Sequence, residues 1–147
     1  MSLGEQIQAD ANSAAKARDK QRLSALRMLL DALSKEAKQQ RAELDEQGEI
    51  AVLNRERKRR VEAAEAFRKG GREDAAEAEQ AEAAVIDAYL PEQLSDSDLR
   101  AIVEGAVGES GASSMQDMGK VMSAAMPKVA GRADGKRVNE LVRELLG

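Results

Sequence analysis

The chain has 147 residues, a net charge of −4, no cysteine and no histidine. The lack of cysteine excludes disulfides and thiolate metal sites, and the lack of histidine removes the usual general base and the commonest metal ligand. No apolar run approaches the roughly 20 residues of a membrane span, and no secretory signal pattern is present. We therefore expect a cytoplasmic protein without a membrane contact.

The composition predicts an all-α fold. Apolar residues make up 42% of the chain, many of them alanine, and aromatic residues make up 1%. Such residues suit helix-on-helix packing, whereas strand formers are scarce and never alternate over a useful length. We expect an N-terminal set of helical hairpins, or a bundle of about four helices, followed by a small C-terminal domain of three helices.

The first four predicted helices form an N-terminal domain, residues 1–92. The polar segment Asp45–Gly48 is expected to end the second helix, and Gly70-Gly71 to reverse the chain after the third. Pro91 closes the fourth helix, because proline disfavours helical backbone at the residue before it. Hydrophobic periodicity places these helices at residues 3–17, 19–44, 49–69 and 72–90.

Apolar stripes predict the buried faces of these helices. In the second helix, Met28 and Leu29 widen a leucine stripe enough for it to touch two neighbours. The fourth helix is rich in small residues, which permit close approach of another helix. Its expected buried residues are Ala75, Ala78, Val85, Ile86 and Tyr89.

A basic run in the third helix could suggest a nucleic-acid patch. Its members are Arg55, Arg57, Lys58, Arg59 and Arg60. Positions spaced in this way spread around a helix rather than lining one face. Acidic residues within one turn, Glu56, Glu62 and Glu65, are placed for local pairing. The pattern favours a solvated, ion-paired helix face over a nucleic-acid site.

The sequence changes character at residues 91–95, and residues 95–147 form the predicted C-terminal domain. Ser95 is a good N-cap with Asp98 three residues later, and that helix should end near Gly108 or Gly111. Ser113 or Ser114 is expected to cap the next helix, with Gln116 or Asp117 in the reciprocal position. A last helix begins near Asp134.

Four methionines of the middle helix, Met115, Met118, Met122 and Met126, have two possible roles. Methionine is adaptable and is used at binding grooves, so an exposed stripe would indicate a docking surface. Their helical spacing favours packing into the core instead.

No catalytic constellation is present. Without histidine, a nucleophilic serine lacks its usual base, and no spacing supports a Ser-Lys pair, although the pair stays possible. No glycine-rich phosphate loop of either common spacing occurs. We expect no catalytic residue, no metal and no cofactor.

Positive charge concentrates in the segment Gly119–Gly135 and the start of the last helix. If Asp134 is the N-cap, then Lys136 and Arg137 lie in the first turn, where positive charge opposes the helix dipole. The free N–H groups of that turn, with nearby cations, would suit a phosphate. The alternative is that these are exposed side chains whose small penalty is tolerated. The candidate anion-binding residues are Lys120, Lys128, Arg132, Lys136 and Arg137.

Several segments together resemble the GatB/YqeY family, in particular its free-standing YqeY-like members. They are LRMLLDAL (residues 26–33), FRKGGRED (67–74), YLPEQLS (89–95) and residues 111–142. The family's C-terminal three-helix domain is similar to the tail of the B subunit of the glutamine-dependent aspartyl/glutamyl-tRNA amidotransferase, where that tail helps to hold tRNA. The resemblance implies two helical domains, tRNA association and, as an inherited label, carbon–nitrogen ligase activity with glutamine as amido-N-donor.

Three hypotheses follow from residues and resemblance together. The first is a non-catalytic accessory protein that engages tRNA, a tRNA amidotransferase or an aminoacyl-tRNA complex through its C-terminal domain. The second is a protein–protein adaptor without RNA contact. The third is a contributing subunit of an amidotransferase, since the glutaminase and ATP-using parts of that enzyme have no counterpart in 147 residues.

Overall fold

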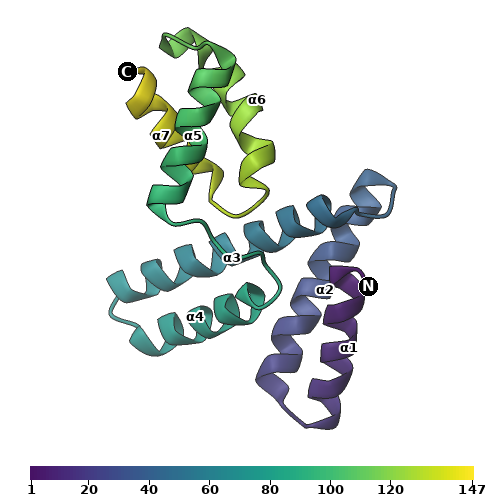
Figure 1. Cartoon of the computed structure of the whole chain (residues 1–147). Coiled ribbons are helices and arrows are strands. Elements are labelled where there is room, and N and C mark those ends of the chain that lie inside the picture. The colour runs from purple at the N-terminus through teal and green to yellow at the C-terminus, as the bar shows by residue number, and fades with distance from the viewer. The chain divides into compact units, whose positions relative to one another are not determined.

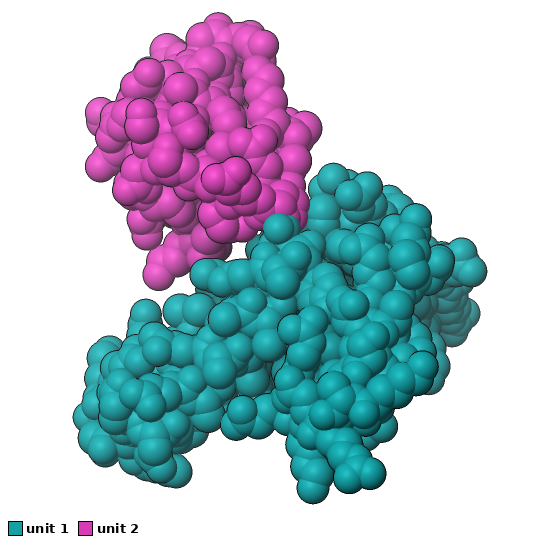
Figure 2. All heavy atoms as spheres, turned by 60° about the horizontal axis from the view of Figure 1, so that its bottom comes forward, with its two compact units in different colours: residues 1–90 teal, residues 91–147 magenta.

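The computed structural model describes residues 1–147 and confirms an all-α protein without strands. Contacts divide the chain into two compact units, residues 1–90 (unit 1) and residues 91–147 (unit 2), coloured separately in Figure 2. The helices of unit 1 are α1 (Leu3–Lys16), α2 (Lys20–Gln40), α3 (Glu46–Lys69) and α4 (Glu73–Asp87). Those of unit 2 are α5 (Asp96–Ser110), the short 3₁₀-helix η1 (Met115–Asp117), α6 (Met118–Val129) and α7 (Gly135–Leu146). No helix combines the length and the apolar character needed to cross a membrane.

Unit 1 consists of two helical hairpins, α1–α2 and α3–α4, that run in different directions (Figure 1). They meet over one apolar core, whose members come from all four helices. The largest fully buried side chains of this core are Ile7, Leu26, Leu29, Leu53 and Ile86. The distal half of the α3–α4 hairpin, residues 61–80, extends beyond α1–α2 and buries fully only Ala64 and Ala76.

The segment Asp45–Gly48 begins a helix, so its prediction as a helix stop is wrong. α2 ends earlier, at Gln40, and its C-cap Arg41 adopts left-handed backbone with φ of 57°. Asp45 is the N-cap of α3, and its side chain accepts a hydrogen bond from the Gly48 N–H at 2.7 Å. Aspartate is a strong N-cap, and two acids in the first turn favour the positive end of the helix dipole. These local preferences outweigh the glycine signal.

Glu49 joins the start of α1 to α3. Its side-chain oxygens accept hydrogen bonds from the Leu3 and Gly4 N–H groups, at 3.3 and 2.7 Å. The residue is only 6% exposed. A Cβ atom on Gly4 would lie 3.2 Å from the carboxylate, which is a tight contact. The carboxylate therefore satisfies N–H groups that a helix start leaves without an intrahelical partner.

The expected buried faces of unit 1 are confirmed on α2 and wrong in part on α4. α2 packs against α1, α3 and α4, with Leu29 buried and with the sulfur of Met28, a residue that is 40% exposed, 3.8 Å from the Arg60 guanidinium of α3. On α4, Ala78 is exposed, and the fully buried alanines are Ala76 and Ala83. With alanines spread around α4, apolarity alone does not set the register of this helix, and packing against α3 decides it.

Unit 2 is a three-helix domain around its own core. Ser95 caps α5 as predicted, its hydroxyl accepting from the Asp98 N–H, and the helix ends at Ser110 with Gly111 as its C-cap, at φ of 67°. Ser114 precedes η1 without a side-chain cap, whereas Asp117 accepts from the Ser113 N–H. The largest fully buried side chains of this core are Leu99, Val103, Val121, Val129, Val138 and Leu141.

Pro127 lies inside α6, although proline is disfavoured in the interior of a helix. The helix continues to Val129, which is fully buried, and its burial in the core holds the last turn. The reversal is made by Ala130 and Gly131, with φ of 49° and 75°. Proline removes one backbone donor, but here apolar burial outweighs that loss.

Candidate nucleic-acid interface

The start of α7 has the charge pattern that the sequence predicts. Asp134 is its N-cap and accepts from the Lys136 N–H at 3.0 Å. Lys136 and Arg137 follow in the first turn, which contains no acidic residue. Positive side chains there oppose the helix dipole, so this charge pattern disfavours the helix start.

Three segments of unit 2 meet at this helix start. The Leu94 N–H donates to the Arg132 carbonyl oxygen at 2.7 Å, which ties the approach to α5 to the α6–α7 loop. The Arg137 guanidinium lies 3.4 Å from the Asp96 carboxylate at the start of α5. The structure thus brings Arg132, Lys136 and Arg137 to one end of the domain.

Lys120 and Lys128 do not join this group. Lys120 lies in the first turn of α6, with its ammonium 3.9 Å from Asp117. The rise of an α-helix places the end of α6 about 14 Å further along its axis. The Lys128 ammonium is held 2.7 Å from Glu109, in the last turn of α5. The five predicted cations therefore do not form one patch. Three of them lie together at the start of α7, and the other two lie elsewhere on unit 2.

Acidic neighbours offset much of this positive charge. Unit 2 carries seven Lys and Arg against nine Asp and Glu. Partial desolvation lowers the pKa of Arg137, but hydrogen bonds from its guanidinium to Asp96 and Glu140 outweigh this and raise the pKa overall. Arg132 and Lys136 take part in no ion pair, and Lys136 is exposed. Of the five predicted cations, these two have no acidic partner that an external anion would have to displace.

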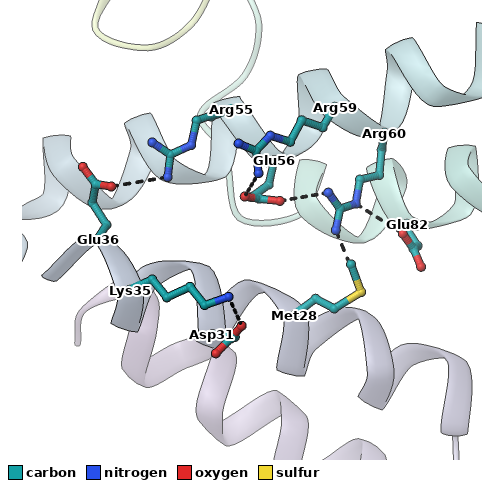
Figure 3. A network of polar contacts seen from close by, with 9 residues as sticks. All are labelled: Met28, Asp31, Lys35, Glu36, Arg55, Glu56, Arg59, Arg60 and Glu82. Carbon is teal, nitrogen blue, oxygen red and sulfur yellow. Dashed lines mark hydrogen bonds and ion pairs between the residues drawn. The ribbon is translucent and has the colours of Figure 1, made fainter. Parts of the chain in front are cut away.

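The Arg55–Arg60 run is ion-paired, as the sequence predicts. Glu56 bonds both Arg59, at 3.2 Å, and Arg60, at 2.8 Å (Figure 3). The sequence did not indicate the partners from other helices. Arg55 pairs with Glu36 of α2 at 3.4 Å, Arg60 also bonds Glu82 of α4 at 3.2 Å, and Arg57 bonds Asp87.

The methionines of unit 2 divide between two environments. Met118 and Met122 are half-buried against the core, as predicted. Met115 and Met126 are 44% and 38% exposed, so core packing is the wrong prediction for them. Met115 lies in η1, before the regular turns of α6 begin, which removes it from the buried stripe.

Acidic clusters in the structure do not form a metal centre. No group of three or more Asp or Glu side chains is placed to hold a metal ion. Every buried side-chain nitrogen or oxygen has a hydrogen-bond partner. The candidate site is therefore a group of cationic side chains at the surface, at the start of a helix.

Comparison with protein families gives one match across nearly the whole chain. The model of the family described as Yqey-like protein matches residues 4–146. The chain belongs to the Yqey-like family. All four segments that carried the resemblance lie inside the matched residues, so that assignment is confirmed. A comparison of this Yqey-like chain with curated proteins finds no match.

Proposed function

We propose that this Yqey-like chain is a non-catalytic, cytoplasmic accessory protein that contacts tRNA through the α7 start of unit 2. The observation that supports it best is the pair Lys136 and Arg137 in an acid-free first turn, with Arg132 two residues before the N-cap Asp134. A phosphate there would accept from exposed side chains and sit at the positive end of the helix dipole. The resemblance of unit 2 to the tail of the amidotransferase B subunit supports tRNA as the polyanion.

The acids at this site set the character of the contact. A phosphate that binds Arg137 must displace the Asp96 carboxylate from it. Exposed ion pairs of this kind are weak enough to exchange partners. Binding through so few cations is expected to be weak and strongly dependent on salt. This fits an accessory that works beside a tRNA amidotransferase or an aminoacyl-tRNA complex rather than a protein that captures RNA alone.

The test is a titration of labelled tRNA across salt concentrations. We compare the wild type with a variant in which Lys128, Arg132, Lys136 and Arg137 are all alanine. Each lost phosphate contact should lower the slope of log affinity against log salt by about 0.7 to 0.9. An unchanged slope in the variant would sink the proposal.

Matched variants sharpen this test. Arg100→Ala with Arg143→Ala removes two exposed cations elsewhere in unit 2 and should leave the slope nearly unchanged. Asp96→Asn removes the acid that competes for Arg137 and should strengthen tRNA binding. Both results are needed. If only the net charge of the protein mattered, the tRNA affinity of all three variants would follow their net charges.

A second candidate is a protein–protein adaptor without RNA contact. The exposed Met115 and Met126 favour it, because exposed methionine suits adaptable apolar docking. Protein partners that persist after nuclease treatment, together with no tRNA affinity, would favour the adaptor. A contributing role in an amidotransferase predicts instead that adding the chain changes the transamidation rate.

A further inference from the structure

A charged groove lies between α2 and α3 in unit 1. The hollow between the two helices has a volume of about 420 Å³. It adjoins a second hollow of about 450 Å³ along the surface of α2, and the two share Met28 and Asp31. Figure 3 shows Glu36 and Met28 reaching from α2 toward Arg55 and Arg60 of α3. The walls of the first hollow therefore come from two helices that belong to different hairpins of the unit, and α2 alone lines the second.

The groove is positive although the chain is acidic. Its lining includes six cations, Lys20, Arg27, Lys35, Arg55, Arg59 and Arg60, and three acids, Asp31, Glu36 and Glu56. The whole chain has a net charge of −4. A local excess of three positive charges on such a chain attracts an anionic partner.

Several of these cations are available to a partner. The side chains of Lys35 and Arg59 are 76% and 64% exposed, and that of Arg55 is 46% exposed. Exposed cations gain little from their ion pairs and exchange partners readily. Glu56, which is 9% exposed, keeps Arg60 as a partner when Arg59 leaves. Arg60 differs, since it is held by Glu56 and Glu82 and serves as a fixed wall.

The lining favours a protein partner over an RNA strand. No aromatic side chain lines the groove, so bases have no stacking platform. Three carboxylates interrupt the row of cations and would repel a continuous phosphate backbone. The exposed Met28, with Leu23 and Ala32, provides an apolar strip between the charges. Mixed charge beside an apolar strip matches the face of an amphipathic helix.

We infer that the α2–α3 groove is a docking site for an acidic amphipathic helix of a partner protein. The cationic side of the groove runs from Lys20 to Lys35 on α2, which is about 22 Å of helix axis. A partner helix of about 15 residues has the same length. Its glutamates would pair with Lys35, Arg55 and Arg59, and its apolar side would cover Met28.

The experiment uses the full chain and a synthetic, end-capped helical peptide of that length. The peptide carries glutamates beside a leucine and alanine stripe, and a second peptide has every glutamate replaced by glutamine. Fluorescence anisotropy gives the affinities, and backbone NMR shifts locate the peptide. We expect the acidic peptide to bind, to shift the amides of α2 and α3 that line the groove, and to bind more tightly than the neutral peptide.

Two triple variants locate the binding energy. Lys35→Gln, Arg55→Gln and Arg59→Gln together should weaken binding of the acidic peptide by about tenfold, by analogy with measured exposed ion pairs. Lys16→Gln, Lys38→Gln and Lys69→Gln together remove the same charge from exposed positions outside the groove lining and should change little. Circular dichroism checks that both variants remain folded.

Three outcomes would overturn the inference. One is equal affinity of the acidic peptide for both triple variants. Another is tighter binding of an oligouridylate of equal length than of the peptide, which would make the groove an RNA site. The third is concentration-dependent self-association of the chain that the groove variant abolishes, because the occupant would then be a second copy.

Discussion

Arg60 and Glu56 form the least exposed ion pair in unit 1, with side chains that are 12% and 9% exposed. Removing one partner of such a pair leaves the other charge without compensation in a poorly solvated place. Arg60→Ala should therefore destabilise the protein by about 3 kcal/mol, measured from urea unfolding. Arg59→Ala removes a contact to the same carboxylate from a side chain that is 64% exposed, and should cost less than about 1 kcal/mol. Equal losses in the two variants would show that Glu56 is well solvated.

Tyr89 is the chain's single tyrosine, and its hydroxyl donates to Asp10 of α1. Burial, aided by Asp10, raises the pKa of Tyr89 from its ordinary value near 10 to about 12. The folded state therefore holds this proton more tightly than the unfolded state does. Stability from this group is complete below pH 10 and is lost as the pH rises toward 12.

Absorbance measures this titration directly, because no other tyrosine and no tryptophan contributes. We expect the phenolate of the native protein to appear near pH 12 rather than near pH 10. Tyr89→Phe should remove the corresponding fall in stability, which is at most about 2 kcal/mol because the residue is only partly buried. A native titration midpoint near 10 would contradict the contact with Asp10.

Single residues also show where prediction from sequence succeeds. The caps Ser95 and Asp134 were predictable, because an N-cap depends on its own side chain and the next three residues. Glu49 was not, since its partners lie 45 and 46 residues away. Nothing in the local pattern distinguishes a glutamate that will bind a distant helix start from one that will face solvent.

At the scale of the element, the cations in the first turn of α7 lower the stability of the helix and are also the residues proposed to bind tRNA. Lys136→Glu places an acid in the first turn, where it interacts favourably with the helix dipole. The variant should be more stable by about 0.3 to 1 kcal/mol in thermal unfolding. The same change should weaken tRNA binding and lower its salt slope. A variant that is stabilised yet binds tRNA as before would separate the charge pattern from RNA contact.

Helix boundaries were harder to predict than helix existence. Both Asp45–Gly48 and Pro127 carry residues that commonly mark helix ends, yet one begins α3 and the other lies within α6. In each place a second influence decides: the aspartate cap in the first, and burial of Val129 in the second. The sequence shows that both tendencies are present, but it does not show which of them is energetically stronger.

For the whole molecule, each unit contains its own core, and no buried residue of one core belongs to the other. Residues 91–147 alone should therefore keep their helix content and unfold cooperatively, with a stability of no more than about 3 to 5 kcal/mol. Circular dichroism of this fragment during urea titration checks the expectation. A fragment without cooperative unfolding would mean that unit 2 depends on unit 1.

The all-α class and the candidate cations followed from composition and spacing, but the way in which the cations group did not. Lys128 comes close to the α7 cations in sequence, yet it is held by Glu109. The groove of unit 1 could not be predicted either, because it depends on how α2 and α3 pack against each other. Local periodicity predicts which face of a helix is buried. It does not predict a surface that two helices form together, because that surface depends on how they pack.

The distal half of the α3–α4 hairpin buries only two residues, both alanines, and this affects how readily it unfolds locally. Alanine buries little area, so these turns gain much less from packing than the leucine-rich part of unit 1. Their amides should exchange with deuterium well before those of α2, through openings that leave the rest of unit 1 intact. The tip of this hairpin then behaves as a separate unit of local unfolding, with its own equilibrium between closed and frayed forms.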